Sequence, residues 1–285
     1  MATLLRLEIS DADAEHFPIV IDRAEKVVEL RNAVLEMAFT GRLVPRLVSD
    51  SAVATLLGVI DAGWSKRSRK EVLPAVEPDE VQVGPSHWTW VRLGNLAEVV
   101  GGVTKGRDLK GRKCISLPYL RVANVQRGFL DLAQMKEIEI ADDELPKYRL
   151  MGGDVLFTEG GDWDKLGRAT VWANQIEPCI HQNHVFRARL VCSELDPAWV
   201  SSFANSPVGR RYFESAAKRT TNLASINMRQ LRHCPIPLPP AEEKARIVAK
   251  VDHLMKLCDD LEAKLRRAED RASKLVEAVV QEMVA

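Results

Sequence analysis

The sequence predicts an α+β fold in which one mixed α/β globular domain is joined to long helices that pair as antiparallel or coiled-coil helices. Three observations support this prediction. From residue 241 onward, apolar residues recur every seven positions over about five repeats. A second amphipathic stripe covers residues 20–40. Between these segments, residues 88–240 contain short β-prone runs separated by turns rich in glycine and proline.

We divide the 285 residues into four segments. Residues 1–50 contain an N-terminal helix expected to partner the C-terminal one, and residues 51–85 contain a short helix and a linker. Residues 86–240 form the globular domain, and residues 241–285 form the C-terminal helix. The linker assignment rests on the three prolines between Pro74 and Pro85.

The N-terminal helix is expected over residues 20–40. Its apolar stripe repeats every seven residues and comprises Val20, Val27 and Val34, with Leu30 and Met37 beside them. Gly41 follows where a C-terminal cap belongs, and Pro45 prevents the helix from continuing.

The globular domain is predicted to be built from short strands. The β-prone runs are residues 90–93, 119–122, 154–157, 169–172 and 184–188. A short helix is expected over residues 198–205, because Asp196 can cap it and Pro197 suits its first position. The four prolines between Pro235 and Pro240 end the domain.

The C-terminal helix begins at Ala241 and carries a heptad seam. The seam consists of Ile247, Val251, Leu254, Cys258, Leu261, Leu265, Ala268, Ala272, Leu275 and Val279. A single amphipathic helix cannot bury such a seam, so it needs a partner. The nearest candidate is the stripe that includes Val27, Leu30 and Val34.

Composition describes an ordinary globular chain, with 46% hydrophobic residues, 28% charged residues and zero formal net charge. The charge is unevenly distributed. Basic residues dominate 105–113 and 187–232, whereas acidic residues gather in the first fifteen positions, at 142–144 and in the final helix. This pattern fits a protein that touches DNA in one region and proteins elsewhere, although a solvated surface of mixed charge fits it equally well.

Other protein classes find little support. The N-terminus does not resemble a signal peptide, and no apolar run approaches a membrane span, so a cytoplasmic chain without a membrane partner is expected. The five cysteines are widely spaced and lack a Cys-x-x-Cys pair, which favours free, mostly buried thiols.

No catalytic or metal site is predicted. His181 and His184 lack further ligands at metal-binding spacing, and the segment Gly101–Gly106 lacks the full phosphate-cradle motif. Glu159, Asp162 and Asp164 crowd one loop, but the neighbouring glycines favour a tight turn with solvated acids over a nuclease site. Methyltransferase and helicase motifs are also missing from the sequence.

DNA contact has better candidates, because Arg, Lys, Asn and Gln side chains on loops can reach bases and phosphates. The candidates are Lys105, Arg107, Lys110, Arg112, Lys113, Arg121, Asn124, Gln182, Asn183, His184, Arg187, Lys218, Arg219, Thr220, Thr221 and Asn222. A solvated loop is the alternative for each one alone, and only their joint density favours DNA binding.

Several motifs resemble the specificity subunits of type I restriction–modification systems. Trp88–Gly94 is similar to the W-x-W-x-x-L-G opening of a target-recognition domain, and Pro118–Arg121 and His181–Arg187 continue that pattern. Pro235–Glu243 resembles the junction that follows such a domain, although Lys244 stands where the family usually has glutamine. The heptad helix resembles the conserved spacer of the family.

The resemblance implies a non-catalytic chain that reads double-stranded DNA and docks methyltransferase and motor-nuclease subunits. S-adenosylmethionine, ATP and Mg²⁺ would then bind those partners, and this chain would bind no cofactor itself. The spacer contacts would use Val27, Leu30, Val34, Ile247, Val251, Leu254, Leu261, Leu265 and Leu275.

Length is the main departure, since such subunits usually carry two recognition domains and two spacers, and this chain has one of each. A homodimer reading a palindromic bipartite site is one interpretation. Pairing with a different half-subunit and a truncated gene product remain alternatives, as does a coiled-coil scaffold that never reads DNA. A stand-alone nuclease is the least favoured interpretation.

Overall fold

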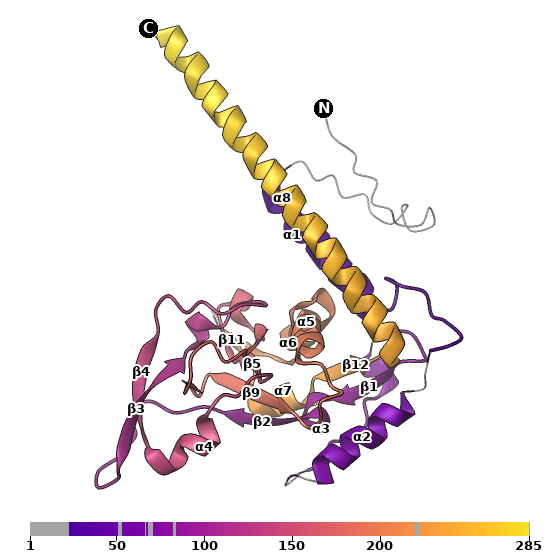
Figure 1. The fold of residues 1–285 in the computed structure, drawn as a ribbon, viewed down its shortest axis with the longest axis vertical. Helices are drawn as coiled ribbons and strands as arrows, with labels where there is room; N and C mark the ends of the chain where they lie inside the picture. Colours follow the sequence, from indigo (N-terminus) through magenta and orange to yellow (C-terminus); the bar gives the residue numbers. More distant parts are fainter. Residues whose placement is uncertain are drawn as a thin grey trace.

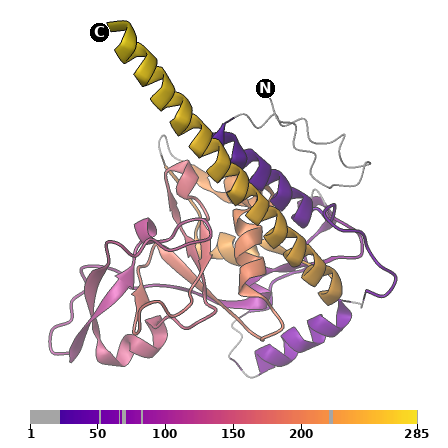
Figure 2. The same cartoon turned by 45° about the horizontal axis from the view of Figure 1, so that its top comes forward.

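The computed structural model describes residues 23–284 apart from 51–52, 66, 68–70, 82–83 and 220–222. A globular domain of mixed strands and helices carries one long helix, α8 (Ala241–Val284), which projects away from it (Figure 1). Helix α1 (Val27–Phe39) lies along the part of α8 nearer the domain in both views (Figures 1 and 2). The predicted α+β class, with a long C-terminal helix, is confirmed.

The globular domain contains four small sheets. The central sheet is antiparallel, in the order β2 (Ala97–Gly101), β9 (Val185–Leu190), β5 (Val155–Thr158) and β7 (Ala169–Val171). A second sheet has the order β4 (Lys136–Ala141), β3 (Cys114–Leu120) and β8 (Ile180–His181). The third has the order β10 (Lys218–Arg219), β11 (Ala224–Ser225) and β6 (Gly160–Gly161). The fourth pairs β1 (Thr89–Arg92) with β12 (Pro235–Leu238).

Short helices connect and cover these sheets. They are α2 (Ala54–Ser65), α3 (Leu93–Leu96), α4 (Leu145–Tyr148), α5 (Pro197–Asn205), α6 (Pro207–Ala216) and α7 (Met228–His233), with 3-10 turns at Ala24–Lys26, Pro78–Glu80, Val122–Asn124, Asp142–Glu144 and Trp163–Lys165. Asp196 caps α5 by accepting from the Ala198 amide at 2.9 Å, as predicted. Phe157 on the central sheet meets Phe213 of α6, which places the main core between that sheet and the helices.

Helices α1 and α8 run antiparallel. The Ala24 amide donates to the Glu269 carboxylate at 3.0 Å, and Arg31 pairs with Asp259 and Glu262 at 2.6 and 2.7 Å. The apolar seam between the helices contains the buried Val27, Leu30 and Cys258, with Leu261 and Leu265 packed beside them. Val34 and Leu254 are also buried, and Ile247 is buried in the main core of the domain. The expected helix over 20–40 is shorter than predicted at its start, because Arg23 is extended. Val20 lies outside the described residues.

Polar and aromatic contacts join the two long helices to the domain. Glu243 of α8 is buried, and its carboxylate accepts from the Trp88 indole at 3.0 Å and lies 2.8 Å from the His87 ring. At the end of α1, the Phe39 ring lies 4.7 Å from that of Trp199, between centroids. The direction in which α8 leaves the domain is therefore fixed by buried contacts.

Arg246 also ties the start of α8 to the chain that follows α1. Its guanidinium binds both carboxylate oxygens of Asp50 at 2.7 and 2.8 Å, and this pairing lowers the pKa of Asp50 to about 2.

Among the described residues, no helix is both long enough and apolar enough to cross a membrane.

Replacing Glu243 with alanine should lower the free energy of unfolding by about 2–4 kcal/mol, because the substitution leaves the buried Trp88 indole without its acceptor. Urea denaturation of the purified chain measures this change. The exposed neighbour Glu242 provides the matched control, and Glu242→Ala should cost less than about 0.5 kcal/mol. Equal losses for the two variants would show that the buried contact does not hold the junction.

Candidate functional site

The polar turn Gln182–His184 is held against two other segments of the chain. Strand β8 runs parallel to β3, so that the Gln182 amide donates to Leu120 O at 2.9 Å. The Asn183 amide donates to Val103 O at 3.0 Å. This approach requires glycine at position 102, where a Cβ would lie 1.9 Å from the His181 carbonyl oxygen. The turn therefore has a fixed position at the edge of the second sheet.

The same turn contacts the loop that carries Glu159. The Glu159 amide donates to His184 O at 2.9 Å, and its carboxylate lies 2.5 Å from His184 Nδ1. Strand β6 then pairs with β11, where a Cβ at Gly160 would lie 2.1 Å from Ala224 O. We call this area the β6–β11 surface. It consists of Glu159–Gly161, Gln182–His184, Lys218 and Ser225, and the buried Ala224 lies beneath it.

The two histidines of this region have different environments. His181 is fully buried, and burial lowers the pKa of its imidazole to about 4, although a hydrogen bond between Nδ1 and Val185 O at 2.6 Å opposes that shift. His184 is about half exposed and faces Glu159. Within the described part of the chain, no group of His, Cys, Asp and Glu side chains has the arrangement of a metal site.

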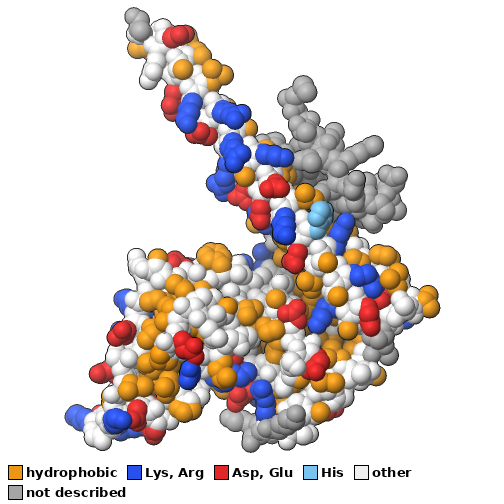
Figure 3. Space-filling model, in the orientation of Figure 1, with side chains coloured by type: hydrophobic (Ala, Val, Ile, Leu, Met, Phe, Trp, Pro, Cys, Tyr) orange, Lys and Arg blue, Asp and Glu red, His pale blue; other side chains and the backbone are white. Residues whose placement is uncertain are grey.

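The basic segment 105–113 is paired with the acidic turn at 142–144. Arg107 binds both carboxylate oxygens of Glu144 at 2.8 and 2.9 Å, and this contact lowers the pKa of Glu144. The other contacts are Arg112 with Asp143 at 2.6 Å and Lys113 with Asp142 at 2.9 Å. The view in Figure 3 shows charges of both signs mixed at the lower left of the domain. Three of the five bases in this segment are therefore paired with acids, whereas Lys105 and Lys110 keep no acidic partner among the described residues. That the segment contacts DNA stays a prediction.

Three further candidates serve the interior of the domain. Arg187 is only 3% exposed and donates to the carbonyl oxygens of Lys147 and Arg149 at 3.2 Å each. Asn124 is buried and donates to Asp131 O at 2.8 Å, while Arg121 donates to Gln134 O at 2.7 Å. The burial of Arg187 and Asn124 does not fit the prediction that they contact DNA directly, because Arg187 Nη1 and the Asn124 amide donate to backbone carbonyl groups and Arg187 Nη2 lies 3.5 Å from the Glu98 carboxylate.

The last group of candidates is only partly described. Strand β10 places Lys218 in an exposed position opposite Ser225. Arg219 pairs through its backbone with Ala224, and its side chain lies outside the described set, as do Thr220, Thr221 and Asn222.

The loop over residues 158–168 holds groups that the sequence did not identify. Its acids, which suggested a nuclease, are paired with bases: Asp162 with Lys165, and Asp164 with Arg168. The bond from Lys165 lowers the pKa of Asp162. Arg127 and Arg210 approach the same loop from distant parts of the sequence.

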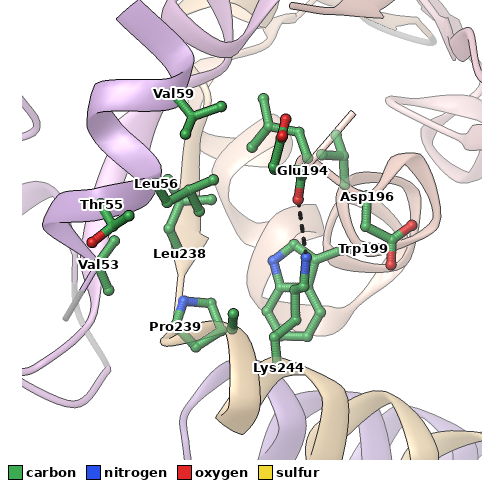
Figure 4. A pocket seen from close by; sticks show the side chains of 13 residues that line it. Val53, Thr55, Leu56, Val59, Glu194, Asp196, Trp199, Leu238, Pro239 and Lys244 are labelled. Atoms are coloured by element: carbon green, nitrogen blue, oxygen red, sulfur yellow. Dashed lines mark hydrogen bonds between the residues drawn. The ribbon is translucent and has the colours of Figure 1, made fainter. Parts of the chain in front are cut away.

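An apolar pocket lies between α2, α5 and the start of α8 (Figure 4). Leu56 and Val59 of α2 form one side, Trp199 the other, and Pro239 and Lys244 the base near the start of α8. The Lys244 ammonium donates to Glu194 O at 3.4 Å. The lining is mostly apolar, with Glu194, Asp196 and Lys244 as its charged residues.

The buried His181 predicts a pH dependence of stability. Above about pH 6.5 both states hold a neutral imidazole, but between about 6.5 and 4 only the unfolded chain takes up the proton. The free energy of unfolding should therefore fall over that range by up to about 1.4 kcal/mol per pH unit. Urea denaturation between pH 7 and 4.5 should show a shallower dependence for His181→Asn, whereas the exposed His184→Asn should behave as wild type. Identical slopes for all three chains would contradict the burial of His181.

Comparison with known proteins places these features in a family. A family model described as "Type I restriction modification DNA specificity domain" matches residues 85–268. The match covers the globular domain and the part of α8 that α1 contacts.

Individual relatives agree with the family model. The type I restriction enzyme EcoKI specificity subunit of Escherichia coli K12 is 26% identical over 69% of this chain and 42% of its own length. The EcoEI specificity subunit of Escherichia coli is 22% identical over 93% of this chain and 46% of its own length. The chain thus spans about half the length of these curated relatives.

One solved structure has the same fold. It comes from work on complex assembly and conformational transition of the type I R-M system, and it matches 91% of this chain and 56% of its own with a TM-score of 0.51 and 18% identity.

Proposed function

The chain belongs to the family of type I restriction–modification DNA specificity domains, and we propose that it reads one half of a bipartite DNA sequence. The match of the family model to residues 85–268 carries this proposal, because it spans all four sheets of the globular domain together with residues 241–268 of the helix that leaves it. The geometry contributes a candidate surface for the reading.

We assign base reading to the β6–β11 surface. Gln182 and Asn183 can form paired hydrogen bonds with adenine, and Lys218 can donate to guanine or to phosphate. The backbone of the 182–184 turn is held by three other segments, so these side chains start from a fixed position. Such positioning favours discrimination between bases, since a misplaced donor loses its bond.

The two long helices would hold the partner subunits. Methyltransferase subunits would bring S-adenosylmethionine, and a motor-nuclease subunit would bring ATP and Mg²⁺, so that this chain contributes no catalytic group. The surface of α8 carries charged side chains of both signs along its length, which suits specific docking between proteins (Figure 3).

A second copy of this chain would complete the helical arrangement. Beyond Glu269, α8 has no contact with α1, and a run of apolar side chains on it is exposed. That run comprises Leu275, Val276, Val279, Val280, Met283 and Val284. A two-fold pair of chains would cover these side chains and hold two reading domains at a fixed separation. Such a homodimer would read a palindromic bipartite site.

Reversing the charge of β10 should abolish sequence reading but not assembly. In Lys218→Glu with Arg219→Glu, the β6–β11 surface would repel phosphates, and the complex with methyltransferase should bind its DNA at least tenfold more weakly. Lys113→Glu is the control, because Lys113 lies in the segment already paired with acids. Gel filtration measures assembly of each variant with methyltransferase, and titration with DNA measures its affinity. Normal DNA modification by the β10 variant would mean that these two residues do not take part in reading.

Mapping methylated adenines tests the homodimer. After co-expression with the methyltransferase subunit, one bipartite motif with reverse-complementary halves is expected. An asymmetric motif would show that a different half-subunit pairs with this chain. A stable complex that leaves host DNA unmethylated would favour a scaffold role instead.

A further inference from the structure

Three arginines from distant parts of the sequence meet at the loop over residues 158–168. Arg127 Nη2 and Arg168 Nε each donate to Asp164 O at 3.0 Å, so the two guanidinium groups lie on either side of one carbonyl oxygen. The turn that carries Arg127 is held in place by a bond from the Gly128 amide to Ala169 O at 2.9 Å. Arg210 of α6 lies close enough for its charge to act on Arg127.

The positive charge of this cluster is only partly compensated. The Asp164 carboxylate pairs with Arg168, whose Nη1 also donates to Gln126 Oε1 at 2.6 Å, and Glu214 supplies a second negative charge near Arg127. Burial lowers the pKa of Arg127 to about 10, and the charges of Arg210 and Arg168 lower it in the same direction. Arg127 therefore stays protonated at neutral pH in the presence of two like charges, an arrangement that a bound anion would stabilise.

One donor of the cluster lacks a partner. Arg127 Nη1 is shielded from solvent and makes no hydrogen bond within the described part of the chain. Buried donors are nearly always satisfied, and Arg127 Nη1 is one of five buried side-chain atoms without a partner among the described residues, so it is available to a ligand oxygen once the side chain turns toward solvent. Guanidinium groups bind phosphate oxygens through two N–H bonds at once, which makes phosphate the anion that this donor set fits best.

We propose that Arg127, Arg168 and Arg210 form a phosphate-binding site that holds one backbone phosphate of the DNA. The site adjoins the β6–β11 surface, because the Arg168 amide donates to Thr158 Oγ1 at 3.0 Å and Thr158 directly precedes Glu159. A phosphate fixed there sets the register of the duplex, while the neighbouring surface reads bases. This inference rests on the proposed function, and its test is arranged so that each can fail separately.

The primary test compares two adjacent arginines of α6. Arg210→Gln removes one member of the cluster, whereas Arg211→Gln removes a charge that pairs with Glu36 of α1. In the complex with methyltransferase, Arg210→Gln should weaken DNA binding roughly three- to tenfold near 0.1 M salt and reduce the slope of log K against log salt by about 0.9. The methylated motif should stay the same, and Arg211→Gln should match wild type.

A second variant separates phosphate geometry from charge. Arg127→Lys keeps the positive charge but loses the planar pair of donors, so its DNA affinity should also fall while the chain stays folded by circular dichroism. If Arg210→Gln and Arg127→Lys both bind DNA as Arg211→Gln does, the phosphate site is overturned while DNA reading stands.

Inorganic phosphate distinguishes a DNA phosphate from a free one. In thermal unfolding of the full chain, phosphate should raise the Tm of wild type and of Arg211→Gln relative to chloride at equal ionic strength, but not that of Arg210→Gln. If phosphate raises the Tm in this pattern while the wild-type complex binds no DNA, the anion site is supported with free phosphate as its ligand, and the proposed reading function is contradicted. The absence of both effects would overturn the site and the reading function together.

Discussion

The buried carboxylate of Glu243 is the contact on which the arrangement of this molecule depends. It accepts from Trp88 and lies beside His87, and thereby joins the first turn of α8 to the segment that opens the globular domain. A carboxylate taken out of water must be satisfied by hydrogen bonds of defined direction, so the helix cannot rotate without breaking them. Phe39 packs on Trp199 at the same end and fixes α1 in turn. Because these contacts anchor the first turn of α8 in the stable core, they fix the direction of the whole helix, which is about 65 Å long.

The charges of the globular domain are mostly balanced by nearby charges of opposite sign. The basic run at 105–113 and the acidic turn at 142–144 lie far apart in sequence, yet they neutralise each other through Arg107, Arg112 and Lys113. The loop over 158–168 differs, because there Arg127, Arg168 and Arg210 gather around fewer carboxylates. Tertiary contacts thus decide where positive potential remains on the domain. The distribution of charged residues along the sequence does not predict those places.

The sequence predicted those features that depend on local chemistry. The heptad seam identified α8, the Asp196 cap identified α5, and the β-prone runs identified β1, β5, β7 and β9 within a few residues, whereas the run over 119–122 overlaps only the end of β3. It could not predict that Arg187 is buried, since an arginine in a β-prone run suits a solvent-facing position equally well. Nor could the sequence predict that Gly102 and Gly160 allow three segments to pack closely. A glycine shows that a close backbone contact is possible, but it does not identify the segment that makes the contact.

A neutral chain with few uncompensated charges is poorly suited to hold DNA by itself. Non-specific affinity comes mainly from phosphate neutralisation, and a cluster of three arginines replaces few counterions. Useful affinity then requires that several weak contacts act together, which they do only when their separation matches the spacing of their sites on the duplex. Under the proposed function, a partner that covers the exposed apolar run of α8 beyond Glu269 would also set the distance between two reading surfaces. Weak DNA contact by one domain would then be compensated by the fixed helical connection to the second domain.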